Sequence, residues 1–185
     1  MSFKQFFTNK NAKSFSEAVV NSGIPQNATL VKMEQVHGCE IKQVEEIEKT
    51  ETDSCPAVLE INEVDACYTS QKNTFLSVKT ADCLPILIHG FRNQPEQEFV
   101  AAAHAGRKST QQKILYKLLE ELNSEYNFVK KLKEEQTVSG LKIKKSDVLY
   151  ICFGPAICVD CYQIDKKTNL HFDLIEKNKK QLELF

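Results

Sequence analysis

Two histidines and one cysteine in the first 104 residues stand in short contexts of small residues and have types that bind catalytic metal ions. They are His37 in Gln35-Val36-His37-Gly38, Cys83 in Thr80-Ala81-Asp82-Cys83-Leu84-Pro85, and His104 in Ala101-Ala102-Ala103-His104-Ala105-Gly106. Two imidazoles and one thiolate are ligands of catalytic zinc sites, in which three protein ligands leave one position open for water or substrate. The three residues therefore point to a metalloenzyme.

The neighbours of these residues strengthen that interpretation. A histidine or cysteine taken alone is more often structural than a ligand, but Gly38 and Gly106 leave the approach to His37 and His104 free of side chains. Asp82 directly precedes Cys83, and a carboxylate beside a thiol suggests a hydrogen-bond partner, a ligand or an acid–base group. His89 and His171 lack small neighbours of this kind, and we expect them to be structural.

The elements around Cys83 and His104 are expected to bring these two residues together. Residues 84–89 and 99–104 are apolar enough to form buried strands, and residues 90–98 contain glycine, asparagine and proline, which favour turns. The resulting hairpin places Cys83 and His104 at the same end. His37 lies at a bend between two short strand-like runs, 29–36 and 39–44, and no local pattern brings it to the other two.

A helix is predicted directly after His104. Ser109 and Thr110 are good N-cap residues, and they precede an apolar stripe formed by Ile114, Leu115, Leu118, Leu119 and Leu122. The start of a helix favours anions such as phosphate. Arg107 and Lys108 are therefore candidate phosphate contacts.

The rest of the chain predicts an α+β fold, in which a single domain spanning residues 1–185 has a mixed β-sheet covered by helices. Helices are expected at 15–21 and 173–184, and strand-like segments at 64–69, 75–78 and 147–153. Residues 45–59 predict an irregular connection, and the lysine-rich residues 130–145 predict a solvated segment.

Composition restricts the partners. Lys+Arg 24 against Asp+Glu 25 gives a net charge of −1, which is not typical of proteins that bind nucleic acid or an anionic membrane surface. We expect a small-molecule ligand, and the oligomeric state is left open. The sequence has no apolar run long enough to span a membrane and no signal-peptide pattern, so we expect a cytoplasmic protein with its seven cysteines as thiols.

One Cys-x-x-Cys motif, Cys158-Val159-Asp160-Cys161, stands apart from the candidate metal ligands. The sequence has no second pair at zinc-ribbon spacing and no helix clearly opening behind the first cysteine. A structural role is favoured, and a redox or site-lining role is the alternative.

Five ordered blocks resemble the YfiH-like family, whose members are called multicopper polyphenol oxidoreductase (laccase) or purine nucleoside phosphorylase. The blocks are Gln35-Val36-His37-Gly38, Asp65-Ala66 with Thr69, Thr80-Ala81-Asp82-Cys83-Leu84-Pro85, His104-Ala105-Gly106 with Thr110, and Gly154-Pro155-Ala156-Ile157 with Cys161-Tyr162. The matched core spans about residues 30–182. The family usually has an aromatic residue after the His-Ala-Gly motif, where this chain has Arg107.

The resemblance implies a YfiH-like laccase-domain fold and a zinc ion bound by His37, Cys83 and His104. It also implies phosphorolysis of adenosine, inosine, guanosine and methylthioadenosine, with adenosine deamination as a companion activity; the substrates are then a nucleoside and phosphate. Gln35, Asp65 and Asp82 match motif positions near the site. We take Asp82, Cys83 and Gln35 as candidate catalytic residues, with Asp82 a candidate proton shuttle.

Three alternatives remain open at this stage. The first is copper-dependent polyphenol oxidation, with Met33 as a distant ligand; however, reduction of oxygen at several coppers needs many imidazoles, and the chain has four histidines. The second is a hydrolase with Cys83 as nucleophile, or editing of peptidoglycan precursors at the same site. The third is a non-catalytic zinc-binding homologue.

Overall fold

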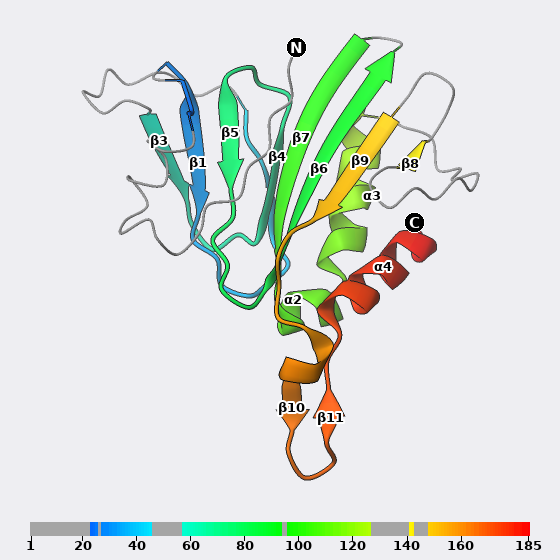
Figure 1. Ribbon diagram of the computed structural model, residues 1–185. Helices are drawn as coiled ribbons and strands as arrows, with labels where there is room; N and C mark the ends of the chain where they lie inside the picture. Colours follow the sequence, from blue (N-terminus) through cyan, green and yellow to red (C-terminus); the bar gives the residue numbers. More distant parts are fainter. Residues whose placement is uncertain (1–22, 26, 46–56, 94–95, 127–140, 143–147) are drawn as a thin grey trace.

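A six-stranded mixed sheet forms the centre of the molecule (Figure 1). The computed structural model describes residues 23–25, 27–45, 57–93, 96–126, 141–142 and 148–185. The strand order is β2 (Ile41–Gln43), β4 (Ala66–Thr69), β7 (Glu96–Ala105), β6 (Leu84–Asn93), β9 (Val148–Phe153) and β8 (Leu141–Lys142). Within the described part of this sheet, β2 and β4 pair in parallel and all other neighbours pair antiparallel. The predicted helix at 15–21 and most of the lysine-rich segment 130–145 lie outside the described residues.

A second, three-stranded parallel sheet lies beside β4 (Figure 1). Its order is β3 (Ala57–Ile61), β1 (Thr29–Met33) and β5 (Thr74–Ser77). Val31, Met33 and Val64 are among the residues of a small apolar core of its own. The predicted irregular connection is wrong at 57–59, because these residues pair in parallel with the start of β1.

The hairpin of β6 and β7 is longer than predicted. Leu84 pairs with Ala105, and the pairing continues to Asn93 with Glu96, so the prediction of a turn across 90–98 is wrong. Gly90 stands opposite Phe99, and a Cβ on Gly90 would lie only 2.0 Å from the Phe99 ring. This glycine makes room for an aromatic ring on the neighbouring strand instead of forming a turn.

Two helices follow β7 where one was predicted. Helix α2 (Arg107–Gln111) ends before Lys113, whose φ of 63° interrupts the helical backbone, and α3 (Ile114–Tyr126) follows. The N-cap of α2 is Gly106, so the prediction of Ser109 or Thr110 as N-cap is wrong. Ser109 lies inside the first turn, where its hydroxyl accepts a hydrogen bond from the Gly106 N–H at 2.8 Å.

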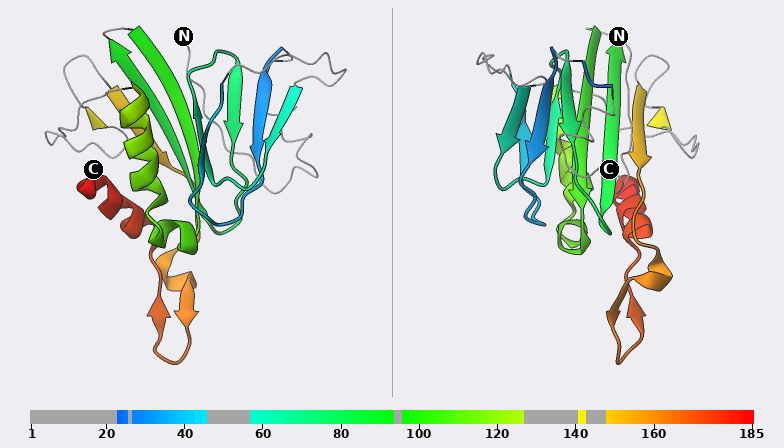
Figure 2. Two further views of the ribbon diagram at one scale, coloured as in Figure 1. Left: turned by 180° about the vertical axis from the view of Figure 1, so that it is seen from behind. Right: turned by 60° about the vertical axis from the view of Figure 1, so that its left-hand side comes forward.

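Helix α3 covers one face of the six-stranded sheet (Figure 2), and its predicted apolar stripe is buried there. Helix α4 (Leu174–Leu184) packs against α3 and α2, and Asp173 caps its start by accepting a hydrogen bond from Glu176 N–H. Between β9 and α4 the chain forms a 3-10 turn η1 (Val159–Cys161) and a small hairpin of β10 (Gln163–Asp165) and β11 (Leu170–His171).

The predicted α+β fold, a mixed sheet covered by helices, is confirmed. Among the described helices, none is both long enough and apolar enough to cross a membrane.

Candidate metal centre

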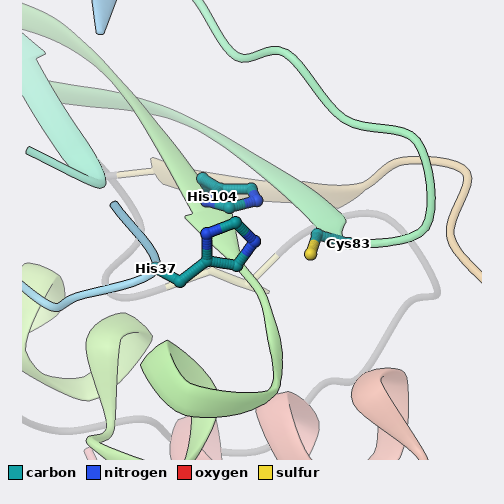
Figure 3. Close-up of side chains that lie close together, drawn as sticks. All are labelled: His37, Cys83 and His104. Atoms are coloured by element: carbon teal, nitrogen blue, oxygen red, sulfur yellow. The ribbon is translucent and has the colours of Figure 1, made fainter. Parts of the chain in front are cut away.

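The three predicted metal ligands meet at one end of the six-stranded sheet (Figure 3). Cys83 directly precedes β6, and His104 lies near the end of β7, where it pairs with Pro85. His37 comes from the loop that follows β1. One ligand atom from each residue lies within 4.8 Å of the other two, and the two imidazole rings stand edge to face with centroids 4.7 Å apart. We call these three residues the ligand group; their role as metal ligands stays a prediction.

Asp65, the residue directly before β4, holds two members of the ligand group in place. Its Oδ1 atom lies 2.7 Å from Nδ1 of His104, and the carboxylate accepts backbone N–H hydrogen bonds from Val36, His37 and Gly38 at 3.2, 3.0 and 2.7 Å. Asp65 is fully buried. One carboxylate therefore fixes the His104 ring and also closes the loop on which His37 adopts a positive φ of 60°.

The hydrogen bonds to Asp65 keep it ionised. Burial by itself raises the pKa of Asp65, but the hydrogen bonds from His104, Gly38 and His37 outweigh burial and hold this pKa below its ordinary value. Since Nδ1 of His104 faces the carboxylate, Nε2 is the nitrogen available to a metal ion. A carboxylate behind a histidine is the usual support of a metal-binding imidazole.

Gly106 provides the space in which the ligand group fits. A Cβ at this position would lie 3.0 Å from Sγ of Cys83 and 3.0 Å from Cδ2 of His37. Ser109 braces the same corner, since its hydroxyl is hydrogen-bonded to the Gly106 N–H and lies 3.2 Å from the carbonyl oxygen of His104. At the small residue predicted to keep this approach open, any larger side chain would therefore press on two of the three ligands.

Gln35 ties the loop of His37 to the loop that leads to Cys83. Its amide donates to the Lys79 carbonyl at 2.7 Å and accepts from the Lys79 N–H at 2.8 Å. The nitrogen and the oxygen of the Gln35 side-chain amide are thus both hydrogen-bonded to backbone. Gln35 therefore holds the two loops in position. Asp82 is exposed, and its carbonyl accepts a hydrogen bond from Ile157 N–H at 2.9 Å.

A cavity of about 370 Å³ opens beside the ligand group. It is lined by Val36, His37, Asp82, Cys83, Arg107, Lys108 and Tyr162. Two predicted phosphate contacts and one predicted proton carrier therefore share a cavity with two of the candidate ligands. The net side-chain charge from Asp82, Arg107 and Lys108 is positive, which suits an anionic ligand.

The thiol of Cys83 is not activated as a nucleophile by its protein surroundings. Burial raises the pKa of Cys83, and the negative charges of Asp82 and Asp65 raise it further. Nucleophilic cysteines need a lowered pKa, normally supplied by a cation or a helix N-terminus. A metal ion would supply the missing positive charge, so this environment suits a metal ligand.

The donor set and its surroundings fit a zinc ion. In a tetrahedral zinc site with bonds of about 2.0–2.3 Å, ligand atoms lie about 3.5 Å apart, so small side-chain adjustments suffice to close the ligand group. The remaining histidines are engaged elsewhere: His89 lies 2.7 Å from Glu98, and Nδ1 of His171 lies 2.9 Å from the Val159 carbonyl oxygen. Met33 packs in the small apolar core.

Two residues at the site had no assigned role from the sequence. The sequence placed Asp65 near the site but gave it no role. Its position at the edge of a short apolar segment, Val64 to Thr69, is a signal for a buried carboxylate, which needs hydrogen-bond donors around it. Tyr162 belongs to a block that carries the family resemblance, and the structure places it in the cavity wall.

Comparison with known proteins identifies the family. Residues 8–184 match the sequence profile described as multi-copper polyphenol oxidoreductase laccase. The chain belongs to this family. A purine nucleoside phosphorylase of Rickettsia conorii is 28% identical over 80% of this chain and 48% of its own length. An adenosine deaminase from an unknown prokaryotic organism is 28% identical over 78% of this chain and 49% of its own length.

Two solved structures share the fold of this chain. The hypothetical protein YfiH of Bacillus licheniformis superposes with a TM-score of 0.59 at 19% identity, covering 96% of this chain and 69% of that protein. YlmD of Geobacillus stearothermophilus gives the same TM-score at 24% identity, covering 90% and 62%. The chain spans about half the length of the curated relatives named above.

Proposed function

We propose that this protein is a zinc-dependent purine nucleoside phosphorylase that acts on adenosine, inosine, guanosine and methylthioadenosine, with adenosine deamination as a second activity. The observation that carries the proposal is the ligand group of His37, Cys83 and His104, supported by Asp65 and open to a cavity with two cationic side chains. Two relatives that are named purine nucleoside phosphorylase and adenosine deaminase support the same chemistry.

The residues of the cavity have separate tasks in this reaction. Arg107 and Lys108, at the first turn of α2, hold the attacking phosphate by charge-assisted hydrogen bonds. Tyr162 offers a flat apolar wall for the purine ring. Asp82 carries a proton to or from the substrate at the exposed edge of the cavity.

The ligand group would hold the metal ion that this reaction uses. Bound zinc provides a Lewis acid for a substrate oxygen in phosphorolysis and for a water molecule in deamination. Asp65 keeps Nε2 of His104 aimed at the metal position, and Gln35 keeps the loops of His37 and Cys83 in register.

The other candidate activities are supported less well. Only two of the four histidines belong to the ligand group, whereas oxygen reduction at several coppers needs more imidazoles. The raised pKa of Cys83 argues against a metal-free cysteine hydrolase. A non-catalytic zinc-binding protein differs from our proposal only in turnover.

Elemental analysis of the purified protein, combined with a nucleoside screen in the presence of phosphate, tests the proposal. We expect about one zinc per chain and phosphate-dependent release of the purine base. His37→Ala and His104→Ala should lose both zinc and turnover, and His37 is exposed, so its removal tests the role without disturbing the core. His171→Ala, outside the ligand group, serves as the matched control. Full phosphorolysis by metal-free His104→Ala protein would show that the mechanism is wrong.

A further inference from the structure

A pair of exposed thiols lies in the turn that leads to the cavity wall. Sγ of Cys158 and Sγ of Cys161 are 2.9 Å apart, at the start and end of the 3-10 turn η1. The turn is closed by backbone hydrogen bonds of 3.1 Å from the N–H groups of Cys161 and Tyr162 to the Cys158 carbonyl. Both side chains are accessible to a reagent in solution.

The two thiols are chemically unequal. The hydrogen bond between the two side chains lowers the pKa of Cys158, and the same interaction raises the pKa of Cys161. Asp160 opposes ionisation of both thiols by its negative charge. Cys158 is therefore the thiol that ionises first, and its partner is held beside it in protonated form.

The surroundings of the pair do not complete a metal site. Across the part of the chain that the structure describes, the only cluster of three or more histidine, cysteine or carboxylate ligand atoms is the ligand group. The nearby His171 directs Nδ1 to the Val159 carbonyl oxygen, 2.9 Å away, and Nε2 lies 3.3 Å from Oδ1 of Asn169. Two adjacent thiols without a third ligand suit disulfide chemistry better than zinc binding.

We propose that Cys158 and Cys161 form a thiol–disulfide exchange site, at which Cys158 attacks a small-molecule disulfide and Cys161 then closes an internal disulfide. With oxidised glutathione as the reagent, the Cys158 thiolate bonds to one glutathione sulfur and the other glutathione leaves as a thiolate. Cys161 next loses its proton to solvent and attacks Sγ of Cys158, which releases the second glutathione. The pair is oxidised by two electrons, and one glutathione disulfide is reduced to two thiols.

Mass spectrometry of the 185-residue chain tests this exchange. Chymotryptic cleavage after Phe153 and Tyr162 gives a peptide, 154–162, that carries both cysteines and no other. After incubation with oxidised glutathione and alkylation of the remaining thiols, we expect this peptide to be two hydrogens lighter and unalkylated. Addition of excess reduced glutathione should restore two alkylated cysteines. If both thiols in the wild-type peptide stay fully alkylated after oxidation, the proposal is wrong.

Single variants test the order of attack. Cys161→Ser should accumulate a mixed disulfide with glutathione at Cys158, because no thiol remains to resolve it, whereas Cys158→Ser should form the corresponding adduct at least several-fold more slowly. Cys39→Ser, which changes a cysteine outside the pair, should behave as wild type at this peptide. Equal rates of adduct formation in both single variants would overturn the assigned roles. Zinc content provides an independent check of folding, since neither cysteine belongs to the ligand group.

Discussion

Replacing Asp65 with asparagine isolates the contribution of one carboxylate to the candidate metal centre. Oδ1 of Asp65 faces Nδ1 of His104 and the N–H of His37, and Oδ2 faces the N–H groups of Gly38 and Val36. Asparagine has the same shape but only one acceptor oxygen, so its NH₂ group must point at two of these four donors. The substitution therefore removes two hydrogen bonds and the buried negative charge without creating a cavity.

The expected effects are large. Hydrogen bonds to a charged group contribute about 1.5–3 kcal/mol each, so the loss of two predicts a decrease of about 3–6 kcal/mol in the free energy of unfolding. Loss of the carboxylate behind a metal-binding histidine weakens metal affinity by about 10- to 100-fold. Both effects arise from the same group, the Asp65 carboxylate, which accepts the backbone N–H hydrogen bonds of the His37 loop and lies 2.7 Å from Nδ1 of His104.

The pH dependence gives a further test. Because the pKa of Asp65 is lower in the folded protein than its ordinary value of 3.8, its ionised form stabilises the fold above that value, and this contribution is lost as pH falls through the folded pKa. The stability difference between wild type and Asp65→Asn should thus stay constant from neutral pH to about pH 5 and shrink in stronger acid.

Urea unfolding of metal-stripped protein, followed by circular dichroism, measures the stability difference, and competition with a chromophoric chelator measures zinc affinity. Asp82→Asn is the matched control, because it removes the same charge beside Cys83 from an exposed side chain. We expect this control to change stability by less than about 0.5 kcal/mol. If Asp65→Asn unfolds and binds zinc like the wild type, the carboxylate does not support the site.

Three further substitutions test the scaffold around the site. Gly106→Ala should weaken zinc binding by about tenfold or more while the fold is retained, because the new Cβ would press on the Cys83 thiol and the His37 ring. The chelator assay measures this loss. Gly38→Ala is the control, since its Cβ would make an ordinary contact of 3.4 Å with Asp65. Gln35→Ala removes both hydrogen bonds to Lys79 and should lower the free energy of unfolding by about 1–2 kcal/mol, measured by urea unfolding. Leu118→Ala, in the fully buried stripe of α3, should lower the free energy of unfolding by about 2–5 kcal/mol and leave the number of zinc ions bound per folded chain unchanged. A smaller loss of stability would contradict the packing of α3 on the sheet.

Local patterns predicted the elements that depend on nearby residues. The apolar stripe of α3 and the strand around Val148–Phe153 follow from periodicity and composition, and both are present. The pairing of β6 with β7 was also predictable, because the two strands are close in sequence. Gly90 misled the prediction of the turn, since its small size serves a contact with Phe99 on the opposite strand, which the spacing of turn residues does not reveal.

Residue types and one hairpin were enough to predict the chemistry available at the site and the meeting of two of its residues. The types of His37, Cys83 and His104 indicated a metal, and the hairpin explains why Cys83 meets His104. The approach of His37 depends on β1 and on four hydrogen bonds to Asp65, whose partners lie 27 to 39 residues away along the chain.

The groups that support this chemistry come together only in the folded chain. A buried carboxylate can stay ionised only if enough donors surround it, and those donors come from separate elements that no local period connects. For the same reason, the double hydrogen bond between Gln35 and Lys79 could not be predicted from composition or spacing. Side-chain types are fixed by the sequence, but the fold fixes their neighbours, and in this protein the neighbours determine which groups are charged, which nitrogen is free and how the ligand group is held.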